Sequence, residues 1–330
     1  HIKEMVRLIN SLMKKELAYK TDDGIYFDVS KFKDYGKLGN LKLEGLKTGG
    51  SSRVSGDEYD KDNARDFALW KFWDKEDGNV SWSSEFGKGR PGWHIECSAM
   101  ASKYLGKTFD IHTGGIDLVF PHHENEIAQS ESCNGKKFVN YWLHNEWMMV
   151  DGKKMSKSLG NYYTIQDIVE KGFSPLALRY FYLTGHYRTQ LNFTLKNLEN
   201  SQNSLDRLKR LVSELKDDGK ANEKYLKQFE KVMDDDLDSV KGLQVLWALV
   251  RDGEVDGGLG AVRRMDEVFG LGLLDVEKVS VPSDVLELVK DRDKARGEKD
   301  WAKADSLRAE IEKKGFKVDD AEGGSRVSVI

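Results

Sequence analysis

Two hydrophobic patterns follow one another along the sequence. Between residues 66 and 150, short apolar runs typical of strands alternate with segments of helical spacing. From Leu195 to about Gly270 the pattern is almost wholly helical, with leucines three and four residues apart, as in a helical bundle. The strand–helix alternation predicts a parallel α/β sheet for the first part. After Pro282 we expect two helices and a short hairpin, which form a small mixed α/β domain.

Composition sets outer limits on the class of protein. The chain has 330 residues, enough for two or three domains. Its formal net charge is −4, so a nucleic-acid partner must be held by local basic patches. Cys97 and Cys133 are too few for a disulfide framework, which predicts a reducing compartment, the cytoplasm. No stretch approaches the roughly 18 apolar residues that span a bilayer, so we expect no membrane partner.

A polar loop bounded by Gly152 and Gly160 carries the strongest single motif. Its sequence is Lys154-Met155-Ser156-Lys157-Ser158. Two lysines on a movable loop can bring ammonium groups to a polyphosphate and stabilise charge that develops on the α-phosphorus. The flanking glycines allow such a loop to close over ATP. A two-lysine loop is more often a solvated surface turn, so the motif alone leaves both interpretations open.

A second group of residues suits a metal ion. His122 and Glu126 stand four apart, so they share one face of a helix, whereas His123 shares its face with Ile127 and is expected to point into the core. Cys97 lies upstream, and the strand and loop between can bring it close. Cysteine, histidine and glutamate together suit Zn²⁺. Without further context, a lone cysteine and a distant histidine are more often core residues.

Four segments resemble signatures of the cysteinyl-tRNA synthetases, a family of class I aminoacyl-tRNA synthetases. They are Gly92 to Met100, Phe109 to Asp117, Phe120 to Glu126, and Lys154 to Ser158, the last matching the family's KMSKS signature. The likeness covers essentially all 330 residues. The resemblance implies a Rossmann-type catalytic domain, of which this chain holds the second half. It also implies ATP-dependent activation of L-cysteine to cysteinyl-adenylate and transfer to the 3′ end of tRNA(Cys).

The resemblance also implies site residues. The family holds one zinc ion through two cysteines, a histidine and a glutamate. Three residues match these ligands: Cys97, His122 and Glu126. Three others match residues that line the pocket for cysteine and ATP: Trp93, His112 and Asp117. In the matched signature, Lys154 to Ser158 bind ATP, with Lys154 and Lys157 as the catalytic lysines. Mg²⁺ is expected with the ATP, and family members are usually monomers.

The implied zinc ion has a role in substrate selection. A substrate thiol can ionise and bind zinc at about 2.3 Å. The hydroxyl of serine is a poorer ligand, and alanine offers none. A site built around a required polar partner rejects an analogue that lacks it by roughly 10⁴ or more, without an editing domain. No segment of the sequence demands an editing domain, which agrees with this role.

Two family features are absent from the sequence. The other class I signature, His-x-Gly-His, packs against the ATP phosphates, and none of the 7 histidines forms it. The fourth zinc ligand, a cysteine near the family's N-terminus, is also absent. Cys133 is a poor substitute, because it lies about two helical turns past Glu126. We therefore expect that the first half of the Rossmann domain precedes His1. We also expect that this chain alone binds zinc weakly and forms no cysteinyl-adenylate.

Five regions are expected along the chain. In order, they are a connective insertion module at 1–65, the second half of the catalytic domain at 66–166, a junction that contacts the tRNA stem at 167–195, a helical anticodon-binding bundle at 196–281, and an anticodon-recognition domain at 282–330. The last region carries basic side chains that can contact phosphates. They are Lys294, Arg296, Lys299, Lys303 and Arg308.

Two other functions remain open from the sequence. A related ligase of mycothiol synthesis shares the zinc pocket and the KMSKS loop, but joins cysteine to a glucosaminyl-inositol amine and lacks the C-terminal anticodon domain. The match from residue 283 onward favours tRNA over that amine. The second alternative is a degenerate synthetase-like module that only binds tRNA. The absent His-x-Gly-His supports it, whereas the intact lysine loop and metal-binding residues argue against it.

Overall fold

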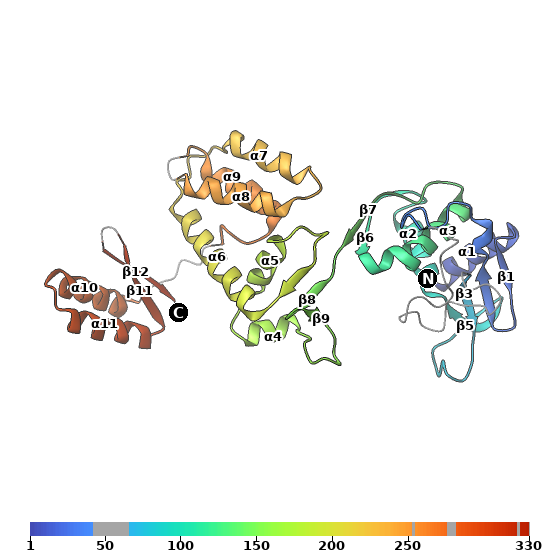
Figure 1. Cartoon of the computed structure of the whole chain (residues 1–330), viewed down its shortest axis with the longest axis horizontal. Helices are drawn as coiled ribbons and strands as arrows, with labels where there is room; N and C mark the ends of the chain where they lie inside the picture. The colour runs from blue at the N-terminus through green and yellow to red at the C-terminus, as the bar shows by residue number, and fades with distance from the viewer. Residues whose placement is uncertain (42–65, 253–254, 276–281, 322–323, 330) are drawn as a thin grey trace. The chain divides into compact units, whose positions relative to one another are not determined.

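The computed structural model describes residues 1–41, 66–252, 255–275, 282–321 and 324–329 (Figure 1). The described fold is mixed α/β, followed by helices and a small C-terminal α/β element. Residues 42–65 of the connective module expected at 1–65 lie outside the described residues. Among the helices of the described part, none is long and apolar enough to cross a membrane.

The first sheet has five antiparallel strands in the order β1-β2-β3-β5-β4. The strands are Ala18–Lys20 (β1), Gly24–Phe27 (β2), Phe67–Phe72 (β3), Trp82–Ser84 (β4) and Gly87–Pro91 (β5). The parallel pairing expected from residue 66 therefore begins only after β5, because tight turns such as the one between β4 and β5 permit antiparallel pairing alone. β2 and β3 lie on opposite sides of residue 65 and pair directly, so this sheet crosses the module boundary expected there.

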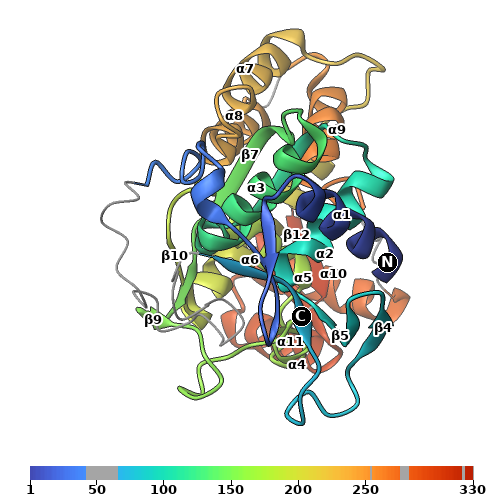
Figure 2. The ribbon, with the colours of Figure 1, turned by 90° about the vertical axis from the view of Figure 1, so that its right-hand side faces the viewer.

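The N-terminal helix α1 (Ile2–Lys14) has the amphipathic pattern expected from its sequence. Its buried residues are Met5, Leu8, Ile9 and Leu12. They join a core with β2 and β3, to which α2 (Trp93–Tyr104) and α3 (Glu124–Asn134) also contribute. A short 3-10 helix, Val29–Lys31 (η1), follows β2. The helices α1, α2 and α3 pack on one another, as Figures 1 and 2 show.

A parallel strand–helix–strand unit comes next and confirms the expected α/β character. β6 (Phe109–Gly115) pairs in parallel with β7 (Val139–Asn145), and α3 lies between them in the chain. Two short helices connect β6 to α3: a 3-10 helix, Ile116–Leu118 (η3), and a π-helical turn, Val119–His123 (η4). α3 ends at Gly135, which has a φ of 63°, the left-handed conformation that favours glycine. This unit places the segment 119–126 at the end of β6.

A second small sheet follows, in the order β10-β8-β9. Its strands are Met148–Val150 (β8), Lys153–Lys154 (β9) and Leu191–Phe193 (β10). Two helices pack with it, α4 (Ile165–Glu170) and α5 (Pro175–Leu183), around a separate apolar core. The capping box of Thr164 and Asp167 begins α4, and Ser174 caps α5 with Pro175 in its first turn. Side-chain caps of this kind satisfy the free N–H groups of a first helical turn, and proline is tolerated there.

Long helices dominate the rest of the chain, as the leucine spacing predicted. They are α6 (Leu195–Glu214), α7 (Glu223–Met233), α8 (Ser239–Arg251) and α9 (Gly258–Phe269). By internal contacts the chain divides into two compact units, His1–Asn203 with Phe229–Gln244, and Ser204–Gln228 with Val245–Ile330. Buried leucines on α6 include Leu198, Leu205 and Leu208.

The C-terminal residues form two helices and an antiparallel hairpin, as expected. These are α10 (Ser283–Gly297), α11 (Trp301–Lys313), β11 (Phe316–Ala321) and β12 (Gly324–Val329). Ala304 and Ile311 of α11 are buried, whereas Trp301 is 57% exposed. The guanidinium of Arg296 lies 5.6 Å from the centre of the Trp301 ring, so this first residue of α11 packs on a cation instead of the core.

Candidate metal and substrate site

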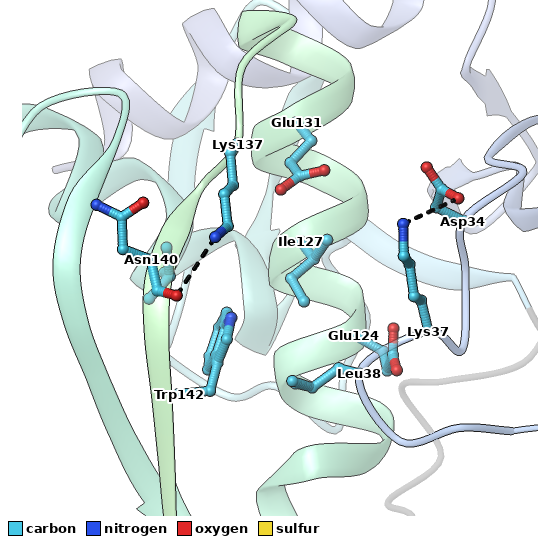
Figure 3. A pocket seen from close by; sticks show the side chains of 10 residues that line it. Asp34, Lys37, Leu38, Glu124, Ile127, Glu131, Lys137, Asn140 and Trp142 are labelled. Atoms are coloured by element: carbon cyan, nitrogen blue, oxygen red, sulfur yellow. Dashed lines mark hydrogen bonds and ion pairs between the residues drawn. The ribbon is translucent and has the colours of Figure 1, made fainter.

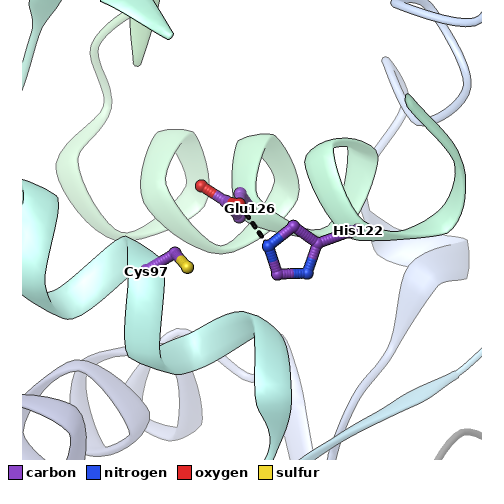
Figure 4. Close-up of side chains that lie close together, drawn as sticks. All are labelled: Cys97, His122 and Glu126. Carbon is purple, nitrogen blue, oxygen red and sulfur yellow. Dashed lines mark ion pairs between the residues drawn. The ribbon is translucent and has the colours of Figure 1, made fainter. Parts of the chain in front are cut away.

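Three side chains from two packed segments converge, as the sequence predicted (Figure 4). Cys97 lies in the first half of α2 and is half-buried. His122 lies in the π-helical turn before α3, and Glu126 lies in the first turn of α3; both are buried. One ligand atom from each of the three residues lies within 4.8 Å of those of the other two. The sulfur, nitrogen and oxygen atoms form a donor set that suits Zn²⁺.

The contacts of Glu126 indicate which of its oxygens faces the metal position. Its Oε2 lies 2.9 Å from Nε2 of His112, at hydrogen-bond distance. Its Oε1 lies 2.8 Å from Nε2 of His122, but has no partner in hydrogen-bond geometry within the part of the chain that the structure describes. A fully buried carboxylate oxygen without a hydrogen bond is costly. A cation beside this oxygen, His122 and Cys97 removes that cost, so the residues present fit a metal ion.

The rings of His94 and Trp93 contact His122 and restrict its orientation. Nδ1 of His94 lies 2.7 Å from Nδ1 of His122, and the ring centres of Trp93 and His122 are 4.4 Å apart. When His122 donates its Nδ1 proton to His94, its Nε2 lone pair faces Oε1 of Glu126, and two adjacent acceptors favour a cation. Sequence reasoning found Trp93 but missed His94, which lies three residues before Cys97 on α2. Residues three apart on a helix lie near the same face, so this spacing could have indicated His94.

Burial and charge shift the acidities of the ligands in opposite directions. Burial raises the pKa of the Cys97 thiol to about 11, and the carboxylates of Glu126 and Glu96 add to the rise. Burial also acts to raise the pKa of Glu126, but contacts with His112 and His122 outweigh it and hold that pKa below its usual range. The glutamate is therefore ready to ligate, whereas the thiol must lose a proton to a bound cation.

A second cluster of rings lies beside the first. His123 is buried, as expected, but its neighbours are polar rings in place of an apolar core: Nδ1 lies 2.8 Å from Nε2 of His144, and the rings of His112 and Trp142 pack against it. Burial lowers the pKa of His123 to about 3, and burial also lowers that of His144. Both rings are therefore neutral at neutral pH. His112, His123 and Glu126 also form a group whose ligand atoms lie within 4.8 Å of one another.

The residues expected to line the substrate pocket lie in two places. Trp93 and His112 border the metal-binding residues, and Trp93 is 54% exposed, so its ring is accessible beside them. Asp117 lies on η3 and is exposed. Its Oδ1 accepts a hydrogen bond from Nε1 of Trp147 at 3.3 Å, a contact that the sequence did not indicate.

The lysine loop follows the start of β9 and is held mainly by the side chain of Asn161. Nδ2 of Asn161 donates to the carbonyl of Lys154, and Oδ1 of Asn161 accepts from the backbone N–H of Ser156. Met155 packs against the second apolar core. Lys157 projects its ammonium over the ring of Tyr162, 5.6 Å from the ring centre. Asn161 therefore fixes the base of the loop, whereas the ammonium of Lys157 makes a weak contact with a ring.

Comparisons with known proteins give two family matches. Residues 1–203 match the model of the "tRNA synthetases class I (C) catalytic domain", and residues 279–327 match the "Cysteinyl-tRNA ligase anticodon binding domain". The chain is 45% identical to the cysteine–tRNA ligase of Brachyspira hyodysenteriae, with 98% of this chain and 74% of that protein covered. It is 44% identical to the cysteine–tRNA ligase of Chlamydia muridarum, covering 100% of this chain and 76% of the relative.

A solved structure described as an arginyl-tRNA synthetase from Campylobacter jejuni is a more distant match. It shares 15% identity over 82% of this chain and 59% of that chain, with a TM-score of 0.43.

Proposed function

Because this chain belongs to the cysteine–tRNA ligase family of class I aminoacyl-tRNA synthetases, we propose that it provides the substrate-selecting and tRNA-binding parts of such an enzyme. In this proposal the enzyme uses ATP to convert L-cysteine to cysteinyl-adenylate and transfers the cysteinyl group to the 3′ end of tRNA(Cys). The convergence of Cys97, His122 and Glu126 is the observation on which the choice of cysteine rests.

Substrate selection depends on one ligand position left for the amino acid. A bound Zn²⁺ would accept the substrate sulfur as thiolate, which serine cannot supply. His112 keeps Glu126 ionised and oriented by occupying Oε2. The ring of Trp93 packs on His122 and remains exposed beside the metal-binding residues, where it would contact the substrate. Asp117, anchored by Trp147, is suited to bind the substrate ammonium.

The lysine loop provides the charge needed for adenylate formation. Attack of the cysteine carboxylate on the α-phosphorus forms a bond to that atom and expels pyrophosphate. Lys154 and Lys157 would bind the phosphate oxygens and stabilise the charge that leaves with pyrophosphate, together with Mg²⁺ carried by the ATP. The loosely held side chain of Lys157 is suited to move when ATP binds.

The chain by itself is proposed to be inactive in adenylate formation. Its 330 residues contain neither a His-x-Gly-His sequence nor a second cysteine close to the metal-binding group, since Cys133 packs at the far end of α3. Three protein ligands without the family's fourth should bind zinc more weakly. The relatives are longer, since this chain covers 74% and 76% of the two compared.

The C-terminal match supports tRNA as the acceptor of the cysteinyl group. Residues 279–327 resemble an anticodon-binding domain, which a ligase for a sugar amine has no need of. We further propose that the protein is monomeric and acts in the cytoplasm. The test is cysteine-dependent exchange of pyrophosphate into ATP by the complete gene product, followed by charging of tRNA(Cys). Serine at the same concentration should give negligible exchange. Exchange with serine at a rate comparable to cysteine, or charging of glucosaminyl-inositol in place of tRNA, contradicts the proposal.

A further inference from the structure

We propose that Glu124 and Asn125 are positioning residues, which hold the turn at residues 35–41 against the start of α3 and so fix the direction in which His122 and Glu126 point. This inference rests on the proposed metal site. It assigns a role to two residues that lie between the ligands in the chain, but do not themselves belong to the metal-binding group.

Glu124 uses both carboxylate oxygens on the backbone of this one turn. Oε2 accepts from the N–H of Gly36 at 3.0 Å, and Oε1 accepts from the N–H of Gly39 at 2.8 Å. The side chain is 0% exposed, so water does not compete for these bonds. Gly36 has a φ of 89°, a conformation that favours glycine and lets its N–H point at the carboxylate. The turn is therefore shaped to fit this one side chain.

Asn125 and the residues before His122 contact the same turn. The hydroxyl of Tyr35 donates to Oδ1 of Asn125, and the Tyr35 ring packs edge-on against Phe120 at 6.5 Å. A Cβ atom at Gly39 would lie 3.4 Å from Val119, so the backbone of the turn comes close to that residue too. The turn therefore touches the segment 119–126 both before and after His122.

Polar contacts carry more of this attachment than packing does. A cavity of about 430 Å³ lies between the turn and α3, and Figure 3 shows side chains that line it. Leu38 lines it from the turn, Ile127 and Glu131 line it from α3, and Trp142 lines it from β7. Where side chains do not fill the space, dispersion contacts are lost. The hydrogen bonds of Glu124 and Asn125 are then the main link between the turn and this end of the helix.

Replacing Glu124 by glutamine keeps the shape but turns one acceptor into a donor. One glycine N–H then faces an amide NH₂, and that hydrogen bond is lost. The first turn of α3 gains freedom to shift, and with it Glu126. Outer partners of metal ligands typically contribute about 10–100-fold to metal affinity. We expect Glu124→Gln to weaken metal binding by about tenfold.

Glu131→Gln is the matched control on the same helix. Oε1 of Glu131 accepts from the backbone N–H of Phe138 at 2.9 Å, at the opposite end of α3 from the ligands. The Glu131→Gln substitution perturbs a comparable hydrogen bond, but not the bonds to the turn at 35–41. A second, milder variant, Tyr35→Phe, removes one hydroxyl from the turn, and it carries the test if Glu124→Gln fails to unfold cooperatively.

The experiment is titration of the full chain with Co²⁺, followed by the thiolate-to-cobalt charge-transfer absorption, with thermal unfolding of each metal-free variant. We expect weaker Co²⁺ binding in Glu124→Gln and Tyr35→Phe, and wild-type binding in Glu131→Gln. The positioning role of Glu124 and Asn125 is overturned if all four chains bind Co²⁺ with equal affinity, or if Glu131→Gln loses as much affinity as Glu124→Gln. Either result leaves the metal site itself intact. A wild-type chain without any thiolate band removes the metal site and the proposed function together with it.

Discussion

Nε2 of His112 lies 2.9 Å from Oε2 of Glu126, and this contact ties the strand β6 to the first turn of α3. His112 lies on β6 and Glu126 lies on α3. The short helices η3 and η4 between these elements bring the two side chains together. The contact leaves Oε1 of Glu126 as the oxygen directed at His122. The orientation of a metal ligand thus depends on a residue that the sequence assigned to the substrate pocket.

Replacing His112 by alanine should therefore weaken both folding and metal binding. Oε2 of Glu126 would be buried without a partner, which costs about 1–3 kcal/mol in the free energy of unfolding. The freed carboxylate could also turn away from the orientation that metal binding needs, and affinity should fall about tenfold or more. Chemical denaturation and Co²⁺ titration of the chain measure the two effects. An unchanged affinity would mean that Glu126 is oriented without His112.

Cys97→Ser should abolish the thiolate-to-cobalt absorption band. Its Sγ is the only sulfur in the metal-binding group within the described residues, and a hydroxyl is a poor substitute. The matched control is Cys133→Ser, since Cys133 packs beside the apolar core at the end of α3. This control should keep the band. If the band is lost in Cys133→Ser but kept in Cys97→Ser, the metal binds at another site.

His123 should make the stability of the chain fall in mild acid. Burial lowers its pKa in the folded state to about 3, whereas an unfolded histidine titrates near about 6.5. Between these values the unfolded state binds more protons, so the free energy of unfolding decreases as pH falls. His123→Gln removes this contribution, and its unfolding free energy should depend less on pH from about 6.5 downward. Parallel pH profiles for the two chains would contradict the assignment.

The sequence predicted which side chains share one face of a helix. It predicted fewer of the contacts between separate helices and strands. The spacing of His122 and Glu126 placed both on one face, and the resemblance added Cys97. It did not predict His94, His144 or Glu124, because their partners come from separate elements that meet only in the folded chain. For the same reason, the antiparallel pairing of β2 with β3 across residue 65 was not visible, since pairing partners are not encoded in hydrophobic period alone.

Lys157→Ala in the complete gene product should slow pyrophosphate exchange with little change in the KM for cysteine. The lysine is proposed to act on charge that develops in the transition state, and loss of one such donor costs about 10²–10³ in kcat. Lys153→Ala is the control, because Lys153 lies on β9 just before the signature and is also exposed. Equal effects of the two substitutions would indicate a general loss of positive charge at the loop instead of a specific role for Lys157.

The most direct measurement is X-ray absorption at the zinc edge of the complete gene product, with and without L-cysteine. If Cys97, His122 and Glu126 leave one position for the amino acid, L-cysteine should add one sulfur neighbour to the zinc, and L-serine should add none. A zinc environment that is identical in the presence and absence of L-cysteine would contradict selection of the substrate through its thiol.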